Sequence, residues 1–419
     1  MIKLEKGNDL TEALHSIEKA LATVDAKRPI AIWAKTVKGH GVKATADSSS
    51  GGHGFPLKAY DEGITGFMEE IWGNKTLPAE FTSWAKELTV KPAAKESTGP
   101  KKDKIQIGVS KALIKAAKEG LPVYSLSSDL AGSTGVKGFH TDCPEHFQDV
   151  GVAESNMVSA AAGMSKAGFI PVVDTFAAFG ITKGNLPLIM ASLSECPVIA
   201  VFSHTGFQDA ADGASHQSLT YMSALSSIPN TVLVNLATAK EAEEYVYQAV
   251  KEIATMREAG QHAPSFIFFL GRENFPLETK EGLTYKIGTP QVIDAGTDAM
   301  IVSTGSMLEE ARAAAEELKA EGKSVAVIHH PFVNRVDGTF FAAMLKKSGS
   351  KLVTVEDHQL IGGMGAMLSH SLKLQGAEFK LASLGVKGEF GQSSYTAQEL
   401  YQKHGVDRSA IVKAVKAIL

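Results

Sequence analysis

The chain has 419 residues, of which 44% are hydrophobic and 21% are charged, a balance typical of globular proteins that excludes a disordered or collagen-like chain. The formal net charge of −4 gives no basic excess of the kind that nucleic-acid binding requires, and the two cysteines, Cys143 and Cys196, have no metal-ligand spacing. No apolar run reaches the roughly 18 residues that a membrane span needs, so we expect a soluble, cytoplasmic protein of about three domains.

Residues 1–90 predict one helix and one strand, which are too little to form a core of their own. Asp9 can cap a helix, with Glu12 reaching back to it as in a capping box. Apolar residues then follow at helical spacing, at Leu10, Leu14, Ile17 and Leu21. Residues 30–34 predict a short buried strand, and residues 38–54 are too polar and glycine-rich for a core element. We therefore interpret residues 1–90 as the tail of a larger domain.

Residues 91–104 are rich in lysine, proline and glycine and predict an exposed linker. Helical patterns then alternate with short apolar strands, which is typical of a parallel sheet covered by helices. In a central domain of residues 105–280, the predicted strands cover 123–126, 170–174, 198–202, 231–234 and 265–270. A C-terminal domain of residues 281–419 has predicted strands at 299–302, 325–328 and 352–355 and a last helix at about 408–418. The predicted fold class is α/β, with two domains built on mainly parallel sheets.

Ligands of such sheets bind at the carboxyl ends of the strands, so the residues directly after each predicted strand are candidates for a site. In chain order these are Asp129, Ser133, Phe176, Phe179, His204, Asp212, His216 and Arg272, which we expect to share one pocket. Some of them also have a purely structural interpretation. Asp129 or Ser133 could cap the next helix, and Phe176 and Phe179, three residues apart, could serve packing alone.

The polar candidates have alternatives too. His204 and His216 are twelve residues apart, which is no metal motif, so their loop could simply be solvated. Arg272 could pair with a carboxylate. Glu154, in a predicted helix start, could be a first-turn carboxylate favoured by the helix dipole. No single one of these residues identifies an enzyme.

Taken together and in this order, the motifs resemble transketolase, a family of thiamine-diphosphate enzymes, along essentially the whole chain. They are residues 36–41 (TVKGHG), 53–57 (HGFPL), 127–130 (SSDL), 174–179 (DTFAAF), 212–217 (DGASHQ), 271–274 (GREN) and 355–358 (VEDH), with the Glu154 segment between the third and the fourth. The resemblance implies a thiamine-diphosphate pyrimidine-binding fold for residues 105–280 and a transketolase C-terminal domain for residues 281–419. Residues 1–90 would be the tail of a diphosphate-binding domain.

The resemblance also implies roles for single residues. Glu154 would hydrogen-bond the pyrimidine ring of the cofactor and tune the base that removes the thiazolium proton. Phe176 and Phe179 would pack around that ring, and Asp129 would line the thiazolium side. The remaining implied roles are contact with the substrate or diphosphate for His53 and His216, binding of sugar hydroxyls for His204 and Asp212, and binding of the sugar phosphate for Arg272 and Ser133. The implied catalytic residues are Glu154, His216 and His53.

The implied reaction is the reversible transfer of a two-carbon ketol group from a ketose phosphate to an aldose phosphate. Xylulose 5-phosphate, ribose 5-phosphate and erythrose 4-phosphate would be the substrates, in the pentose phosphate pathway. The assembly would be a homodimer, or a heterotetramer with an N-terminal transketolase subunit, without nucleic acid or membrane.

Three departures from the family pattern qualify this expectation. The 419 residues contain no Gly-Asp-Gly motif, so the diphosphate and its Mg²⁺ or Ca²⁺ would be held by a partner chain and no metal ligand is expected in this one. Ile107 stands where the family has a phosphate-contacting arginine, which implies weaker phosphate binding or a different acceptor. Thr182 stands where many members have a third aromatic residue.

Alternatives remain open at the level of the sequence. The chain could be the C-terminal subunit of a split enzyme, or a truncated or engineered form. It could be a non-catalytic dimerisation or regulatory protein that keeps the pocket by descent. Among other thiamine-diphosphate enzymes, the beta subunits of 2-oxo-acid dehydrogenases and deoxyxylulose-phosphate synthase resemble it less, because the dehydrogenase subunits lack the His53 segment and the His216 loop is closer to transketolase.

Overall fold

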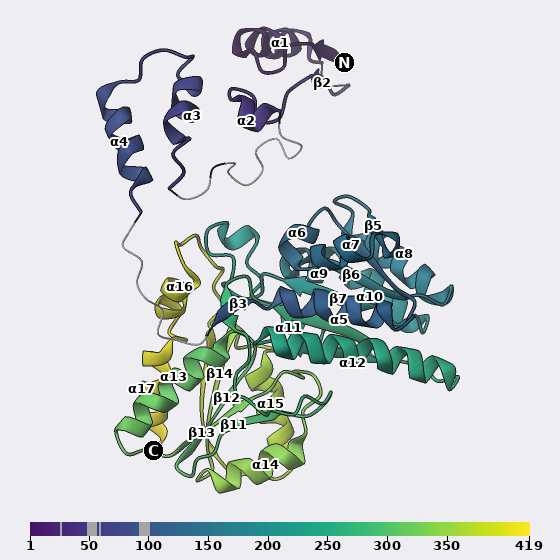
Figure 1. Ribbon diagram of the computed structural model, residues 1–419, viewed down its shortest axis with the longest axis vertical. Coiled ribbons are helices and arrows are strands. Elements are labelled where there is room, and N and C mark those ends of the chain that lie inside the picture. The colour runs from purple at the N-terminus through teal and green to yellow at the C-terminus, as the bar shows by residue number, and fades with distance from the viewer. Residues whose placement is uncertain (26, 48–56, 58–59, 92–100) are drawn as a thin grey trace. The chain divides into compact units, whose positions relative to one another are not determined.

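The computed structural model describes residues 1–25, 27–47, 57, 60–91 and 101–419, and it divides into two units, residues 1–98 and residues 99–419 (Figure 1). The elements of the first unit are β1 (Ile2–Leu4), α1 (Leu10–Thr23), β2 (Ile32–Ala34), α2 (Lys43–Ala46), α3 (Ile64–Ile71) and α4 (Ala79–Thr89). Strands β1 and β2 pair in parallel. Among the described residues, no helix is both long and apolar enough to cross a bilayer.

The first unit forms its helix as the sequence predicts but leaves it uncovered. The Asp9 side chain caps α1 by accepting hydrogen bonds from the backbone N–H groups of Thr11 and Glu12, at 2.9 and 3.1 Å. The backbone N–H of Asp9 donates to the Lys6 oxygen at 2.9 Å, and the Glu12 carboxylate pairs with Lys6 at 3.4 Å, so the second half of the predicted capping box is wrong. The prediction of a buried strand at residues 30–34 is also wrong, because all three residues of β2 are exposed.

The second unit begins with a domain built on six strands. Its elements are β3 (Lys102–Lys104), α5 (Gln106–Lys118), β4 (Val123–Ser127), α6 (Ala131–Thr134), α7 (Lys137–Asp142), β5 (Phe147–Asp149), α8 (Glu154–Lys166), β6 (Ile170–Phe176), α9 (Ala177–Lys183), α10 (Asn185–Leu193), β7 (Ile199–Ser203), α11 (Tyr221–Leu225), β8 (Thr231–Asn235), α12 (Ala239–Glu258), β9 (Ser265–Leu270) and β10 (Asn274–Pro276). The strands of the main sheet run in the order β5-β4-β6-β7-β9-β8 and are all parallel.

Helices cover both faces of this sheet. Helices α5 and α12 lie side by side on one face (Figure 1), where Leu113 and Tyr245 pack with Val201 in one apolar cluster. Helices α8, α10 and α11 contribute to the cluster on the other face. Residues 102–104, predicted as the end of the linker, instead form β3, which pairs antiparallel with β10.

The rest of the unit is a second layered domain. Its elements are β11 (Gln291–Asp294), β12 (Ala299–Ser303), α13 (Met307–Ala320), β13 (Val325–His329), α14 (Gly338–Lys347), β14 (Lys351–Gln359), α15 (Met364–Leu374), β15 (Lys380–Val386), α16 (Ala397–His404) and α17 (Arg408–Ile418). The strand order is β11-β13-β12-β14-β15, and β11 alone among these five runs antiparallel to its neighbour. The predicted α/β class with mainly parallel sheets is confirmed.

A buried carboxyl group joins the two domains of this unit. Asp357, on β14, accepts hydrogen bonds from the Tyr221 hydroxyl at 3.2 Å and from the Ser306 hydroxyl at 2.8 Å, and the Asn235 amide donates to the same tyrosine oxygen at 2.8 Å. A Cβ atom at Gly206 would lie 1.9 Å from the Asp357 carboxylate, so only glycine fits there. One apolar cluster also runs through both domains, from Phe202 of β7 to residues of α14 and α15.

Candidate functional site

Aromatic rings from two strand ends, one helix and one loop meet at the carboxyl edge of the six-stranded sheet. Phe176 ends β6, and its ring stacks on that of Phe179 in α9, with centroids 5.9 Å apart and planes 25° apart. The imidazole of His204, directly after β7, lies 3.9 Å from the Phe176 ring. The His216 ring is 6.2 Å from Phe176 and 5.4 Å from Phe179, in edge-on contacts. We call these four residues the ring cluster.

The local sequence explains why Phe176 and Phe179 face the same way. All seven residues of β6 are buried, and α9 begins at the next residue, Ala177. Residues three apart on a helical turn are neighbours on one face, so the strand-to-helix junction presents both rings together.

His204 is fixed and desolvated. Its backbone takes a φ of 63°, a conformation that is uncommon for residues with a side chain, and its Nδ1 atom shares a 2.8 Å hydrogen bond with the Ser203 hydroxyl. Burial, reinforced by the charges of Arg272, Lys104 and His216, lowers the pKa of His204 to about 3. The imidazole is therefore neutral at physiological pH and can exchange hydrogen bonds with hydroxyl groups.

Arg272, at the end of β9, has a carboxylate partner that the sequence left unassigned. One guanidinium nitrogen, Nη1, donates to Oδ1 of Asp209, whose side chain is fully buried. Burial raises the pKa of Asp209, against the pull of the nearby Arg272 charge. Asp212, the loop acid singled out by the sequence, is exposed. The structural interpretation that Arg272 pairs with a carboxylate is therefore confirmed.

Glu154 occupies the first residue of α8 and is 8% exposed. The prediction that it lies in a helix start, where the dipole favours a carboxylate, is confirmed. The neighbouring Ser155 hydroxyl donates to the backbone oxygen of Lys183, at the end of α9, at 2.6 Å. The start of α8 therefore lies beside the helix that carries Phe179.

The loop before α8 also contacts the segment that follows β4. The backbone N–H of Asp129 donates to the Asp149 carboxylate at 3.2 Å, and the same oxygen accepts from Gly151 at 2.8 Å. Asp129 is itself exposed, with a φ of 62°. The alternative that Asp129 or Ser133 caps the next helix is wrong, because the N-cap residue of α6 is Leu130 and no side chain caps that helix.

A second buried acid, Asp174, fastens the α6 segment to β6. Its carboxylate accepts hydrogen bonds from the hydroxyls of Ser127 and Thr134, at 2.9 and 2.5 Å. Burial raises the pKa of Asp174 to about 7, while these two hydrogen bonds oppose the rise. Ser133 is the exposed neighbour of Thr134 on α6, so its position depends on this attachment.

A cavity of about 1060 Å³ opens beside the ring cluster. Phe179 and Thr182 of α9 line one side. Residues 214, 215 and 217–220 line another, and residues 359–362 and 386–391 of the C-terminal domain complete the cavity. The Thr182 hydroxyl is turned to its own helix and donates to the Ala178 oxygen at 2.8 Å. The position where the family pattern has a third aromatic residue is thus open to the cavity.

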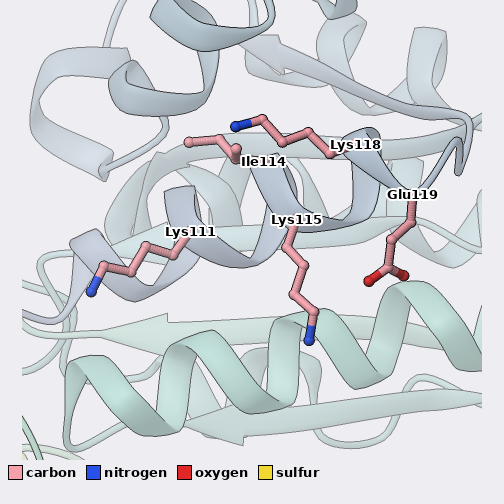
Figure 2. Close-up of a pocket in the computed structure, with 5 residues that line it drawn as sticks. All are labelled: Lys111, Ile114, Lys115, Lys118 and Glu119. Carbon is pink, nitrogen blue, oxygen red and sulfur yellow. The ribbon is translucent and has the colours of Figure 1, made fainter.

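A separate hollow of about 450 Å³ lies on α5, lined by Lys111, Ile114, Lys115, Lys118 and Glu119. Figure 2 shows that the three ammonium groups point away from one another. Lys115 lies over the Tyr247 ring at 3.7 Å, and the Tyr247 hydroxyl donates to Glu119 at 2.7 Å. Lys115 and Glu119 therefore take part in contacts within the fold, and the three ammonium groups do not converge on one point.

Two expectations from the sequence remain, the role of His53 and the absence of metal ligands in this chain. His53 lies outside the described residues. Within residues 1–25, 27–47, 57, 60–91 and 101–419, no group of three or more histidine, cysteine or acidic side chains could hold a metal ion.

Family comparisons agree with this architecture. The family model described as "Transketolase, pyrimidine binding domain" matches residues 104–262, and that of "Transketolase, C-terminal domain" matches residues 288–411. A putative transketolase C-terminal section from Methanocaldococcus jannaschii is 31% identical over 312 residues, which cover 74% of this chain and 94% of that protein. The chain belongs to the transketolase family. Members of this family generally use thiamine diphosphate.

Other relatives show how broad the similarity is. The human transketolase-like protein 2 is 28% identical over 94% of this chain and 62% of its own length. A 1-deoxy-D-xylulose-5-phosphate synthase from Syntrophus aciditrophicus is 27% identical over 79% of this chain, so the chain spans about half, 49%, of that relative. A solved structure titled "Split gene transketolase, inactive beta4 tetramer" aligns with a TM-score of 0.65 and 27% identity, over 75% of this chain and 98% of that one.

Sequence reasoning missed the two buried acids of the site. Asp174 stood in a quoted motif, and its only signal was an acid inside an otherwise apolar strand. Asp209 shares a loop with Asp212, and nothing in the spacing tells which of the two is buried against Arg272.

Proposed function

We propose that this chain is the catalytic C-terminal part of a transketolase, which transfers a two-carbon ketol group from a ketose to an aldose. The observation that carries the proposal is the ring cluster at the carboxyl edge of the six-stranded sheet, beside the helix start that presents Glu154. The aromatic pair, the buried carboxyl group and the adjacent cavity fit the pyrimidine end of thiamine diphosphate.

Each residue would contribute a defined physical effect. Phe176 and Phe179 would hold the flat pyrimidine ring and exclude water from it. Glu154 would hydrogen-bond a ring nitrogen and hold the proton there, which sets the basicity of the neighbouring amino group. When bound, thiamine diphosphate would supply the electron sink that cleavage of a carbon–carbon bond next to a carbonyl requires.

The substrate side would be formed by His204, His216 and Asp212. The neutral imidazole of His204 suits sugar hydroxyls as donor or acceptor, and Ser203 fixes its orientation. Ser215 shares a 2.9 Å hydrogen bond with His216 and orients that ring in the same way. Asp129 would line the thiazolium side of the same space, and His53 would join from the segment outside the described residues.

We infer further that the chain works with a partner that binds the diphosphate and its Mg²⁺ or Ca²⁺. Two relatives support this, because one is named as a C-terminal section and the other as an inactive tetramer of a split-gene enzyme. We propose, in addition, that the chain forms a homodimer or a heterotetramer with this partner and that it is located in the cytoplasm. Calorimetry with thiamine diphosphate and Mg²⁺ should show binding when the partner is present, whereas a non-catalytic relative would show none.

The experiment that tests the activity is a ketol-transfer assay with Glu154→Gln. The assay contains the partner chain, xylulose 5-phosphate as the ketose donor and ribose 5-phosphate as the aldose acceptor. We expect kcat of the variant to be about 10²- to 10⁴-fold lower than that of the wild type. Glu145→Gln, which removes an exposed carboxylate of the same domain, is the matched control and should keep full activity. Near-normal turnover in Glu154→Gln would contradict the assignment.

An assay with pyruvate distinguishes the proposed ketol transfer from the reaction of the deoxyxylulose-phosphate synthases, the other enzyme class among the relatives. The deoxyxylulose-phosphate synthases are named for a different product. Turnover with pyruvate and glyceraldehyde 3-phosphate, without turnover of a ketose donor, would assign the chain to that class instead.

A further inference from the structure

His216 lies on a loop whose two ends are joined and whose residues directly before the histidine are exposed. The ends are joined because the backbone N–H of Gly206 donates to the Ser218 oxygen at 2.8 Å. Ala214 and Ser215 are exposed, so the described fold covers little of the chain just before His216. The position of the His216 ring in the ring cluster therefore depends on the buried anchors of this loop.

Gln217, the next residue, is such an anchor and is only 7% exposed. Its Nε2 group donates to the backbone oxygen of Asp209 at 3.2 Å, within the loop, and to that of Gln392, in the C-terminal domain, at 3.0 Å. A primary amide carries two N–H groups, so both hydrogen bonds form at once. The backbone N–H of Gln217 also donates to the Gly213 oxygen at 3.0 Å, which closes a turn around His216.

Residues 391–394 of the C-terminal domain receive this loop. A Cβ atom at Gly391 would lie 1.6 Å from Oε1 of Gln217, so the amide packs directly on this backbone and only glycine fits there. The backbone N–H of Ser394 donates to the Ala210 oxygen at 2.8 Å. The receiving segment therefore contacts the loop on both sides of its exposed part.

The start of the loop is held by the same domain. The Phe207 ring stacks on that of His404, with centroids 4.6 Å apart, and the Gln208 amide donates to the Tyr401 hydroxyl at 2.6 Å. Both partners belong to α16. The C-terminal domain thus contacts the loop along its length, although it supplies no residue of the ring cluster.

A side chain that contacts a substrate must be held within about 0.5 Å of its working position, and a shift of about 1 Å can lower the rate about a hundredfold. We propose that Gln217 is a positioning residue for His216, through which the C-terminal domain sets the geometry of the site. The inference rests on the proposed ketol transfer, in which His216 contacts the substrate. Phe176 and Phe179 stand on β6 and α9 and keep their positions without the loop.

The test follows the His216 imidazole by nuclear magnetic resonance in the full chain, where its ε1 proton is identified by its loss in His216→Gln. The ring lies 5.4 Å from Phe179, so a displacement changes the ring-current shift of this proton. Gln217→Met keeps the length of the side chain and removes both donors, and it should move the resonance by more than its linewidth. Gly391→Ala should move it as well, because the added methyl group displaces Gln217 from the side of the other domain.

The activity measurement uses the same variants with the partner chain and cofactor. Gln217→Met should lower kcat/KM for ketol transfer about 10- to 100-fold, whereas the affinity for thiamine diphosphate, measured by calorimetry, should stay unchanged. Gln248→Met is the matched control. It removes a donor to the Tyr285 oxygen at 2.9 Å and an acceptor of the Ile287 N–H at 3.2 Å, and it should leave both the His216 resonance and kcat/KM unchanged.

The outcomes separate this inference from the proposed function. A His216 resonance that stays in place in Gln217→Met and Gly391→Ala, or that moves equally in Gln248→Met, would overturn the positioning role. An equal loss of cofactor affinity and kcat/KM in Gln217→Met would overturn it too, because it would indicate a general structural effect. Should Gln217→Met fail to fold, Gly391→Ala carries the same test with the loop sequence intact.

Absence of ketol transfer in the wild type would overturn the proposed function. The resonance measurement needs no turnover, so in that case it still decides whether Gln217 and the C-terminal domain position His216.

Discussion

The two units of this chain use the same kinds of helix pattern and reach opposite results. In the described part of residues 1–91, the buried apolar side chains are Leu4, Val42, Leu77 and Ala85, and α1 buries none of its residues. In residues 101–419, three large apolar clusters fill the space between sheets and helices. An amphipathic pattern therefore predicts which face of a helix is apolar, but not whether another layer covers it.

The largest expected difference between the units concerns core truncation. Phe202, at the centre of the six-stranded sheet, has no solvent exposure and contacts Phe269, so Phe202→Ala should lower the free energy of unfolding by about 3–5 kcal/mol. Leu14→Ala, on the exposed face of α1, should change it by less than about 0.5 kcal/mol. Denaturant unfolding followed by far-ultraviolet circular dichroism measures both, and equal losses would break the comparison.

A second expected difference between the units concerns the pH dependence of the free energy of unfolding, because the second unit contains buried acids such as Asp174. Because burial raises the pKa of Asp174 from its ordinary 3.8 to about 7, the folded state binds a proton that the unfolded state has lost. The free energy of unfolding should therefore fall, through this group, by roughly 1.4 kcal/mol for each pH unit from about 4 to about 7.

The Asp174→Asn variant should remove that part of the slope. Glu356, whose pKa burial raises to about 8, contributes with the same sign, so the measured quantity is the difference between variant and wild type at each pH. Glu18→Gln, on α1 of the first unit, is the control. An unchanged pH slope in Asp174→Asn would show that the Asp174 carboxyl is not desolvated.

The smallest effect sharpens the comparison at the level of single helices. Thr238 caps α12 by accepting from the Glu241 N–H at 3.2 Å, as Asp9 caps α1. Thr238→Ala should lower the free energy of unfolding of the second unit by about 1 kcal/mol, because α12 is packed on the sheet. Asp9→Ala should instead appear as local fraying of α1, measured by amide hydrogen exchange, with no loss in the global transition.

The sequence predicted the fold well where burial follows local pattern. Strand β9 and helix α17 have the predicted bounds, and the other predicted strands of the second unit differ by a few residues at their ends. Strand β14 runs to Gln359, beyond the predicted end at residue 355, because its polar residues 356–358 are buried by partners from other elements. Such partners are distant in the sequence, so the local apolar pattern predicted a strand that ends before the first acid, Glu356.

The candidate site was predicted in the same uneven way. Phe176, Phe179, His204 and His216 contact one another, as expected where parallel strands end at a common edge, but of these four residues Phe179 alone lines the cavity. The pairing of Arg272 with Asp209 could be expected only in kind, as an arginine near an acid. Which acid is buried depends on how the loop of residues 204–217 folds back, and this is decided by tertiary contacts.

The hydrogen bonds of Asp357 have a consequence for protein engineering. Although the two domain families are recognised as separate sequence modules, the tyrosine, serine and asparagine around this carboxyl come from both of them. A chimera that joins one domain of this chain to the matching domain of a relative would have to transplant the residues at positions 206, 221, 235, 306 and 357 as a set. The residues that join the two domains therefore form one unit for the purpose of domain exchange.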